Sequence, residues 1–410
     1  MTRILTEHFD TEPELHEIDV YRRLGGYAGL SKALGMSRAE VVAEVVKSNL
    51  RGLGGAGFPT GGKWQTVPGE DKVPGPRYVV ANADESEPGC FKDRVLITRA
   101  PHQLLEGVLI AAHAIGAKET FIFIRGEYQN QYDVLARAIA QADAAGFTAH
   151  ASIALMRGAG AYISGLDTAL LETMEGKKAW PRQPPPFPTV SGLMGRPTVV
   201  NNVETLSMLP SIMVKGGEWF AKIGSPKNGG TVVFSVSGHV EQPGIYEVPM
   251  GSKLRDVLTL AGGVRGGRKL KCVIPGGTSM PPLLEKDLDI ALDFDAIRAA
   301  GTFLGAGGMI VLDETADAVE VAHNIERFLA HESCGQCTPC REGSFWSEEI
   351  LERMLEGKGE GEDVRNLARI GENITGKVIC ALGDTVGMVT RAYISKFPED
   401  FNKRVATDGS

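Results

Sequence analysis

Two short apolar runs decide the fold of this chain: Arg77-Tyr78-Val79-Val80-Ala81-Asn82 and Glu119-Thr120-Phe121-Ile122-Phe123-Ile124-Arg125. Both are rich in residues that favour strands, and their continuous apolar character is typical of strands buried inside a sheet. The segment between them, 98–116, has the pattern of a helix. A helix over 128–145 and a strand near 148–156 continue the alternation, which predicts an α/β layer.

The first of these strands runs directly into an acidic turn, Asn82-Ala83-Asp84-Glu85-Ser86-Glu87-Pro88-Gly89. Open α/β sheets place their ligands at the carboxyl ends of the strands. Carboxylates at that point can accept hydrogen bonds from ribose hydroxyls or from a flavin ring N–H. A solvated turn closed by Pro-Gly has the same composition, so the turn alone does not decide between the two interpretations.

A glycine loop precedes the first strand: Arg51-Gly52-Leu53-Gly54-Gly55-Ala56-Gly57-Phe58-Pro59-Thr60-Gly61-Gly62-Lys63-Trp64. It is not a Rossmann fingerprint, because it follows a helix, which Ser37-Arg38-Ala39-Glu40 opens with a capping box, and not a strand. It is not a P-loop, because Trp64 stands where Mg²⁺ needs a hydroxyl. The loop is either a turn without a ligand or a row of backbone N–H groups suited to phosphate or pyrophosphate.

The pattern changes after residue 230. Two β-rich runs, 232–237 and 244–248, read as a hairpin, Ser252 is expected to cap a short helix to Leu260, and a further strand begins at Lys271. From Ala316 onward the periodicity is helical, near 317–330, 342–356, 362–373 and 381–395. The sequence therefore predicts three parts: an α/β domain over 1–225, a ubiquitin-like (β-grasp) domain over 226–315 and a C-terminal helical bundle over 316–410.

Four of the six cysteines form one pattern: Cys334, Cys337 and Cys340 in Ser-Cys-Gly-Gln-Cys-Thr-Pro-Cys-Arg-Glu-Gly, then Cys380. Two-residue gaps let consecutive thiolates converge, and the distant fourth ligand closes the set once the chain has folded back, which suits one [4Fe–4S] cluster. Zinc is the alternative, although zinc ligands usually come as two separated pairs. A helix that begins near Arg341 is expected to direct its positive end toward the anionic cluster.

Composition excludes several classes of function. The chain has 410 residues with a formal net charge of −8, which argues against a general nucleic-acid or anionic-membrane surface. It holds no run of eighteen apolar residues, so any membrane association is expected through partner subunits and not by direct insertion. Few cysteines and no apolar export segment indicate a reducing cytosol or matrix. The first thirty-odd residues are expected to be irregular.

Five motifs, taken together and in this order, resemble the NADH-binding flavoprotein subunit of respiratory complex I: the glycine loop at 51–64, the acidic turn at 82–89, Ile124-Arg125-Gly126-Glu127-Tyr128, Gly-Arg-Pro-Thr-Val-Val-Asn-Asn-Val-Glu-Thr at 195–205, and the cysteine motif. The resemblance implies an NADH:quinone oxidoreductase component with FMN and one [4Fe–4S] cluster, oxidising NADH. It also implies a thioredoxin-like [2Fe–2S] subunit and a large Fe–S subunit as partners, in the peripheral arm of a membrane complex on its cytoplasmic or matrix side.

The resemblance also implies roles for individual residues. FMN would be held by Gly52, Gly54, Lys63, Asn82, Asp84, Asn201, Asn202 and Thr205. The NADH positions would be Phe58 and Phe187, which stack on the adenine, Glu87 beside the nicotinamide, and Tyr162 and Asp167. No side chain is assigned as a general acid or base, because the hydride is transferred on the cofactor.

One stretch departs from the family pattern Tyr-Ile-Cys-Gly-Glu-Glu-Thr-Ala-Leu, because this chain reads Tyr162-Ile163-Ser164-Gly165-Leu166-Asp167-Thr168-Ala169-Leu170. Thr66 also replaces an expected aromatic residue, and Leu53 a basic one. Two alternatives stay open: the diaphorase subunit of a soluble NAD-linked hydrogenase or formate dehydrogenase, and a non-catalytic electron-relay or assembly scaffold whose dinucleotide site has lost NADH turnover.

Overall fold

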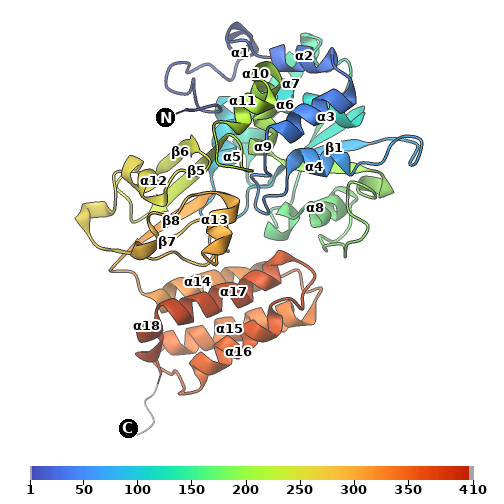
Figure 1. Ribbon diagram of the computed structural model, residues 1–410. Helices are drawn as coiled ribbons and strands as arrows, with labels where there is room; N and C mark the ends of the chain where they lie inside the picture. The colour runs from blue at the N-terminus through green and yellow to red at the C-terminus, as the bar shows by residue number, and fades with distance from the viewer. Residues whose placement is uncertain (1, 406–410) are drawn as a thin grey trace.

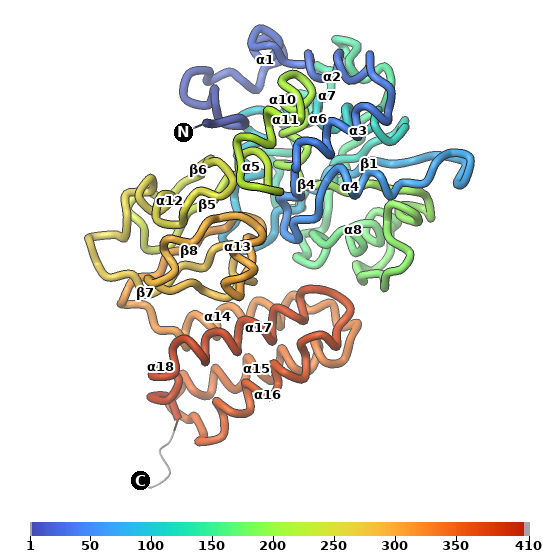
Figure 2. Tube along the Cα trace, in the orientation of Figure 1, coloured from blue at the N-terminus to red at the C-terminus, as the bar shows by residue number. Residues whose placement is uncertain are grey.

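The computed structural model describes residues 2–405, and the chain passes through three groups of elements in turn (Figure 1). The first sheet and its helices lie at the top, the second sheet at the left in yellow and orange, and a layer of red helices at the base. The Cα trace shows that each group is built from one continuous part of the chain (Figure 2). The helical layer contacts both other groups, because Glu332 accepts from the N–H of Tyr162 in the first and Asp400 accepts from Lys271 in the second.

The first sheet is parallel throughout, and its strands stand in the order β3-β2-β1-β4. Their bounds are β1 (Tyr78–Ala83), β2 (Glu119–Ile124), β3 (Ser152–Arg157) and β4 (Thr198–Asn202), so the three strands predicted near 77, 119 and 148 are confirmed. The chain leaves β1 toward β2 on one side and returns as β4 on the other. Sheets of this kind bind ligands at the carboxyl edge of such a switch point, here between β1 and β4.

Helices pack on this sheet, and α6 (Pro101–Ile115) is buried along almost its whole length. The sequence predicts one helix over 98–116, but the structure has two, α5 (Lys92–Arg99) and α6. Ala100 leaves helical geometry at φ −138°, and Pro101, which has no N–H to lose, begins the second helix. The remaining helices of this group are α1 (Ile18–Arg23), α2 (Ala28–Leu34), α3 (Arg38–Lys47), α4 (Thr60–Gln65), α7 (Gln129–Ala144), the 3₁₀ turn η1 (Tyr162–Gly165), α8 (Asp167–Met174), η2 (Leu193–Gly195), α9 (Val203–Ser207), α10 (Leu209–Lys215) and α11 (Gly217–Ala221).

Two details of the first group bear on the predictions. The capping box is confirmed, because the Ser37 side chain accepts from the Glu40 N–H and the Glu40 carboxylate accepts from the Ser37 N–H. The expectation of an irregular opening segment is wrong, because α1 and α2 lie within it. Both are only one to two turns long, too short to give a clear helical period.

The second sheet has the strand order β6-β5-β8-β7, from β5 (Thr231–Gly238), β6 (Gly244–Pro249), β7 (Leu270–Ile274) and β8 (Gly308–Asp313). The predicted hairpin is confirmed, since β5 and β6 pair antiparallel, and β5 and β8 pair parallel at the centre. The group also holds α12 (Leu254–Leu260), η3 (Arg265–Gly267), η4 (Glu285–Asp287) and α13 (Phe294–Ala299). Ser252 does not cap α12: its hydroxyl donates to the carbonyl of Pro249, and Lys253 is the N-cap residue.

The last group is helical: α14 (Ala318–Glu332), α15 (Thr338–Leu355), α16 (Asp363–Ile374), α17 (Ala381–Lys396) and α18 (Pro398–Asn402). Helices therefore occupy all four segments predicted to be helical. α14 and α17 lie on the side toward the two sheets, and α15 and α16 on the far side (Figure 1). α15 begins at Thr338 and not near Arg341, because Pro339 fits the first turn of a helix. Over residues 2–405, none of the helices combines the length and the apolarity needed to cross a membrane.

Candidate functional site

Three asparagines predicted to bind FMN meet at the carboxyl edge of the first sheet. Asn82 near the end of β1 lies opposite Asn202 at the end of β4, with Asn201 beside it. The amide of Asn82 donates to the carbonyl of Gly165 at 2.7 Å. The side-chain oxygen of Asn201 accepts from the Trp64 indole N–H at 3.0 Å. The register of two parallel strands thus brings these side chains together and hydrogen bonds fix their orientation.

The glycine loop lies against this edge. A Cβ on Gly54 would stand 2.7 Å from Cβ of Asn202, so only glycine lets the backbone come this close. The N–H of Leu53 donates to the hydroxyl of Thr205 at 2.9 Å, and Lys63 Nζ donates to the carbonyl of Val200 at 2.8 Å. The loop residues predicted to bind FMN are therefore anchored to the end of β4 and to the start of α9.

Asp84 supplies a test of whether a ligand fits here. Its side chain is buried, and among residues 2–405 its Oδ1 has no hydrogen-bond partner. Burial raises the pKa of Asp84 to about 7, although nearby Arg125 opposes the rise. An unsatisfied buried oxygen costs free energy that a ligand N–H or O–H could recover. The position fits the N–H of a flavin ring, so the donors and acceptors present suit FMN.

Glu87 and Tyr162 are joined directly, because the Tyr162 hydroxyl donates to Oε2 of Glu87 at 2.7 Å. Burial raises the pKa of both groups, so the Tyr162 phenol stays protonated. The backbone N–H of Tyr162 donates to Oε2 of Glu332 at 3.0 Å, and its ring meets the edge of Phe328 at 5.1 Å between centroids. Tyr162 therefore contacts both the acidic turn and α14 of the helical group.

The other predicted NADH residues are Asp167, Phe58 and Phe187. Asp167 is the first residue of α8, and its Oδ2 stands 3.8 Å from Nζ of Lys63. Burial lowers the pKa of Lys63, and Asp167 opposes that effect. Phe58 and Phe187 are 57% and 61% exposed, an arrangement that leaves aromatic faces free for stacking.

Three of the departures from the family pattern, Leu166, Thr66 and Leu53, have different surroundings. Leu166 is the N-cap residue of α8, where it offers no side-chain acceptor. The Thr66 hydroxyl donates to that of Thr189 at 2.7 Å, which ties the end of α4 to the segment after Phe187. Leu53 is 3% exposed and packs in the hydrophobic core, where the family pattern has a basic residue.

A cluster of buried charged side chains beside the site is not predicted from the sequence. Lys92 Nζ contacts Oδ1 of Asp93 at 2.8 Å and Oε2 of Glu204 at 2.7 Å, and all three side chains are buried. The second oxygen of Asp93 accepts from the Asn202 amide at 2.7 Å. Burial raises the pKa of Glu204 to about 7, and Lys92 opposes the rise. No local signal reveals the cluster, because its members come from α5, β4 and α9.

The four predicted cluster ligands lie at one end of the helical group. Cys337 is the N-cap residue of α15 and Cys380 that of α17, so the first turns of two helices begin at thiols. Burial raises the pKa of Cys340, and Cys337, Cys380 and Cys334 raise it further, as expected of neighbouring thiols. Among residues 2–405, no three His, Cys, Asp or Glu side chains converge closely enough to hold a single metal ion.

Backbone N–H groups partly offset the effect of burial on the thiols at this end. Burial raises the pKa of Cys380, and the backbone N–H groups of Leu382 and Gly383 oppose that rise. The positive ends of α15 and α17 act in the same direction. Four thiols with this electrostatic support are a chemically suitable donor set for a [4Fe–4S] cluster.

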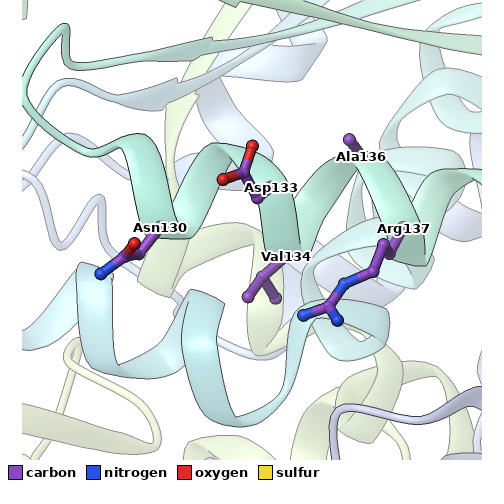
Figure 3. A pocket seen from close by; sticks show the side chains of 5 residues that line it. All are labelled: Asn130, Asp133, Val134, Ala136 and Arg137. Atoms are coloured by element: carbon purple, nitrogen blue, oxygen red, sulfur yellow. The ribbon is translucent and has the colours of Figure 1, made fainter.

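A separate surface pocket lies on α7 and is lined by Asn130, Asp133, Val134, Ala136 and Arg137 (Figure 3). None of these is a predicted site residue. The pocket carries one acidic and one basic side chain, on neighbouring turns of the same helix, and we assign it no role.

Three family descriptions match the chain. Residues 45–211 match the "Nuo51 FMN-binding domain", 233–283 the "SLBB domain" and 320–404 the "NADH-ubiquinone oxidoreductase-F iron-sulfur binding region". The matches divide in the same way as the elements: the α/β sheet, the second sheet and the helical group.

Curated relatives that are F subunits of NADH-quinone oxidoreductase match over nearly the full length. The chain is 46% identical over 400 residues to the second such protein of Rhizobium meliloti (strain 1021), covering 95% of this chain and 94% of the relative. It is 44% identical over 422 residues to the F subunit of Mycobacterium bovis, covering 100% and 95%. It is also 44% identical to the F subunit of Streptomyces coelicolor, covering 99% and 92%.

Among solved structures, a chain of an NAD⁺-reducing [NiFe]-hydrogenase in the H₂-reduced state has a TM-score of 0.85 at 37% identity. The match covers 92% of this chain but 64% of the hydrogenase chain, so this chain spans just under two thirds of that relative.

Proposed function

Because the chain belongs to the family of NADH-quinone oxidoreductase F subunits, we propose that it oxidises NADH on FMN and passes electrons singly through one [4Fe–4S] cluster toward quinone. The observation that carries this function is the meeting of Asn82, Asn202 and the glycine loop at the switch point of the sheet, beside the unsatisfied oxygen of Asp84. When bound, FMN supplies the conversion of a two-electron hydride into single electrons.

In this proposal, the FMN residues divide into three kinds of contact. The ammonium of Lys63 and the backbone N–H of Gly54 would bind the phosphate. The N–H of Gly52 already donates to the carbonyl of Phe58 at 2.9 Å, so Gly52 would contribute by shaping the loop around the cofactor. Asp84 and the side-chain amides of three asparagines would form hydrogen bonds to the flavin ring and the ribitol chain. These asparagines are Asn82, Asn201 and Asn202. Thr205 supports the loop from below through its bond to Leu53.

The NADH residues lie around that cradle. Phe58 and Phe187 offer exposed rings for the adenine, and Asp167 presents its carboxylate toward Lys63 at the start of α8. Glu87, held by Tyr162, stands beside the nicotinamide. These residues bind, orient and exclude water, and none is required to take up or release a proton in the hydride step.

Cys334, Cys337, Cys340 and Cys380 are proposed as the cluster ligands. Tyr162 supports a short route between the two centres, because it contacts Glu87 on one side and Glu332 and Phe328 of α14 on the other. α14 ends at Glu332, two residues before the first ligand.

We also propose the division into domains over 1–225, 226–315 and 316–410. The second sheet supports a β-grasp assignment, because a hairpin, α12 and two further strands follow each other and the first and last strands pair parallel at the centre. The proposed partners are a thioredoxin-like [2Fe–2S] subunit and a large Fe–S subunit, in the peripheral arm of a membrane complex on its cytoplasmic or matrix side.

The first experiment is an anaerobic NADH titration of the purified chain or its complex, followed by visible absorbance and EPR, with flavin, iron and zinc assayed on the same sample. Bleaching of the flavin together with a reduced-cluster signal is expected. Zinc without iron would overturn the cluster assignment, and intact FMN that NADH does not reduce would favour the relay or scaffold function.

A second candidate is the diaphorase subunit of a soluble NAD-linked hydrogenase, which the structural likeness to such an enzyme favours. Purification of the native complex separates the two, because a hydrogenase assembly would contain nickel. For the scaffold alternative, the test is the double variant Leu166→Glu, Asp167→Glu. A large gain in NADH affinity would indicate a weakened native site, and no gain would remove the reason for this alternative.

A further inference from the structure

The loop after β7 reaches from the second sheet onto the acidic turn of the first. The carboxylate of Glu87 accepts four hydrogen bonds, and three of the donors belong to this loop: the N–H of Ser279 at 2.8 Å, its hydroxyl at 2.8 Å and the hydroxyl of Thr278 at 3.3 Å. The fourth donor is Tyr162, whose hydroxyl also lies 3.0 Å from that of Ser279. Most of what fixes Glu87 therefore comes from residues about 190 positions further along the chain.

The backbone of the loop is shaped for this contact. Gly277 has φ +105°, and a Cβ there would stand 2.3 Å from Cγ of Glu87, so only glycine allows the approach. The N–H of Thr278 donates to the carbonyl of Pro88 at 3.2 Å, and the N–H of Gly277 to that of Gly308 on β8 at 2.5 Å. The loop is thus anchored at its base to the second sheet and at its tip to the acidic turn.

We propose that Thr278 and Ser279 are positioning residues of the hydride-transfer site, which hold the Glu87 carboxylate in one orientation beside the nicotinamide. The inference rests on the proposed function, which gives Glu87 that place. Under this inference, the second sheet contributes residues to the hydride-transfer site and does not merely separate the first sheet from the helical group.

The chemical value of the arrangement lies in the charge that develops during the reaction. The nicotinamide ring becomes positive as NADH gives up its hydride, so a fixed carboxylate beside it stabilises the transition state more than the ground state. A carboxylate that already accepts bonds from fixed donors needs little reorganisation to do this. Thr278 and Ser279 supply the fixing and do not themselves touch the substrate.

The ionisation of Glu87 gives a second observable. Burial raises its pKa, whereas the bonds from Ser279, Tyr162 and Thr278 lower it. The titratable groups that face it are Tyr162 from η1 and Cys90 from its own turn, and burial raises the pKa of both, so each stays neutral. Loss of a loop donor therefore raises the pKa of Glu87 further.

The experiment uses the full chain loaded with FMN and cluster, as wild type and as Ser279→Ala and Thr278→Val. Loss of a hydrogen bond to a charged group predicts a fall in kcat of about tenfold to a hundredfold for Ser279→Ala, with a smaller change in KM for NADH. The acid limb of the pH profile is expected to move to higher pH. The infrared carboxylate band of Glu87, identified by subtraction of the Glu87→Gln spectrum, is expected to titrate at higher pH in the variant, independently of turnover.

Controls separate the possible failures. Ser252→Ala removes a hydroxyl from the turn after β6, which within residues 2–405 bonds the Pro249 carbonyl alone, and it is expected to leave turnover unchanged. If Ser279→Ala fails to retain FMN, Thr278→Val carries the same test with a weaker bond removed.

Unchanged kcat and pH profile in the loop variants, while Glu87→Gln impairs turnover, would overturn the inference alone. A uniform loss of kcat at all pH values, with no shift of the band, would also overturn it, because that is the result of a merely structural role. Normal turnover in Glu87→Gln would overturn the proposed place of Glu87, and the inference with it.

Discussion

Replacement of Glu326 by glutamine is expected to stabilise the chain at pH 8 far more than at pH 5. Glu326 lies on α14 with no exposed surface, its Oε1 accepts from the Thr390 hydroxyl at 2.6 Å, and within residues 2–405 its Oε2 has no partner. Burial raises its pKa from 4.5 to about 8, opposed by Thr390 and increased by the nearby Glu348. The folded chain therefore holds a proton over a range of pH in which the unfolded chain has lost it.

The sign and size follow from proton linkage. Between pH 4.5 and about 8 the folded state binds more protons than the unfolded state, so the free energy of unfolding falls as the pH rises. The fall is about 1.4 kcal/mol per pH unit, which amounts to about 3 to 4 kcal/mol between pH 5 and pH 8. Glutamine has the same shape and does not titrate, so the variant lacks this loss.

The assay is urea unfolding of the loaded chain at both pH values, followed by far-UV circular dichroism. The matched control is Glu352→Gln, an exposed carboxyl on α15. An infrared band of a protonated carboxyl, present at pH 6 and absent from the variant, checks the protonation directly. A difference between variant and wild type that is the same at pH 5 and pH 8 would refute the reasoning.

Three further predictions concern the two cofactor sites. Lys92→Met leaves Asp93 and Glu204 buried without their cation, so the free energy of unfolding is expected to fall by about 3 to 5 kcal/mol and FMN to be retained less well. Urea unfolding and flavin content after gel filtration measure the two effects, and normal values for both would contradict the role of the buried cluster. Trp64→Phe removes the indole N–H that donates to Asn201, and the affinity for FMN is expected to fall about tenfold in fluorescence titrations. Unchanged affinity would show that Asn201 does not need this hydrogen bond. Cys380→Ser is expected to abolish the [4Fe–4S] EPR signal while FMN stays bound, and Cys272→Ser, at a buried thiol on β7, is the matched control that keeps it.

The sequence predicts those parts of the molecule that depend on neighbouring residues. β1, β2 and the β5–β6 hairpin follow from continuous or bounded apolar runs, and the helices of the last group from their periodicity. The errors are also local: Pro101 divides what reads as one helix, and Ser252, which reads as a helix cap, donates backward to the carbonyl of Pro249.

The contacts that build the site are of another kind. Asn202 and Asp93 are 109 residues apart, and Ser279 and Glu87 are 192 apart. No periodicity reports such a pairing, because it depends on which strands become neighbours in the sheet. The glycine loop and the acidic turn can be predicted from the sequence as candidate ligand-binding segments, whereas the side chains that hold them in place cannot.

The long-range contacts of Tyr162 set an order of events during synthesis. Its bonds reach Glu87 behind it and Ser279 and Glu332 ahead of it, so all three parts of the chain must have left the ribosome before the residue is fully held. The first sheet can form earlier, because its last strand ends at Asn202. A chain that ends before Ser279 therefore holds the proposed FMN residues but lacks part of the hydrogen bonding that fixes Tyr162 and Glu87. In the proposed function, the residues beside the nicotinamide are fully held only once α14, which leads to the four thiols, is in place, so hydride chemistry begins only when an electron outlet is present.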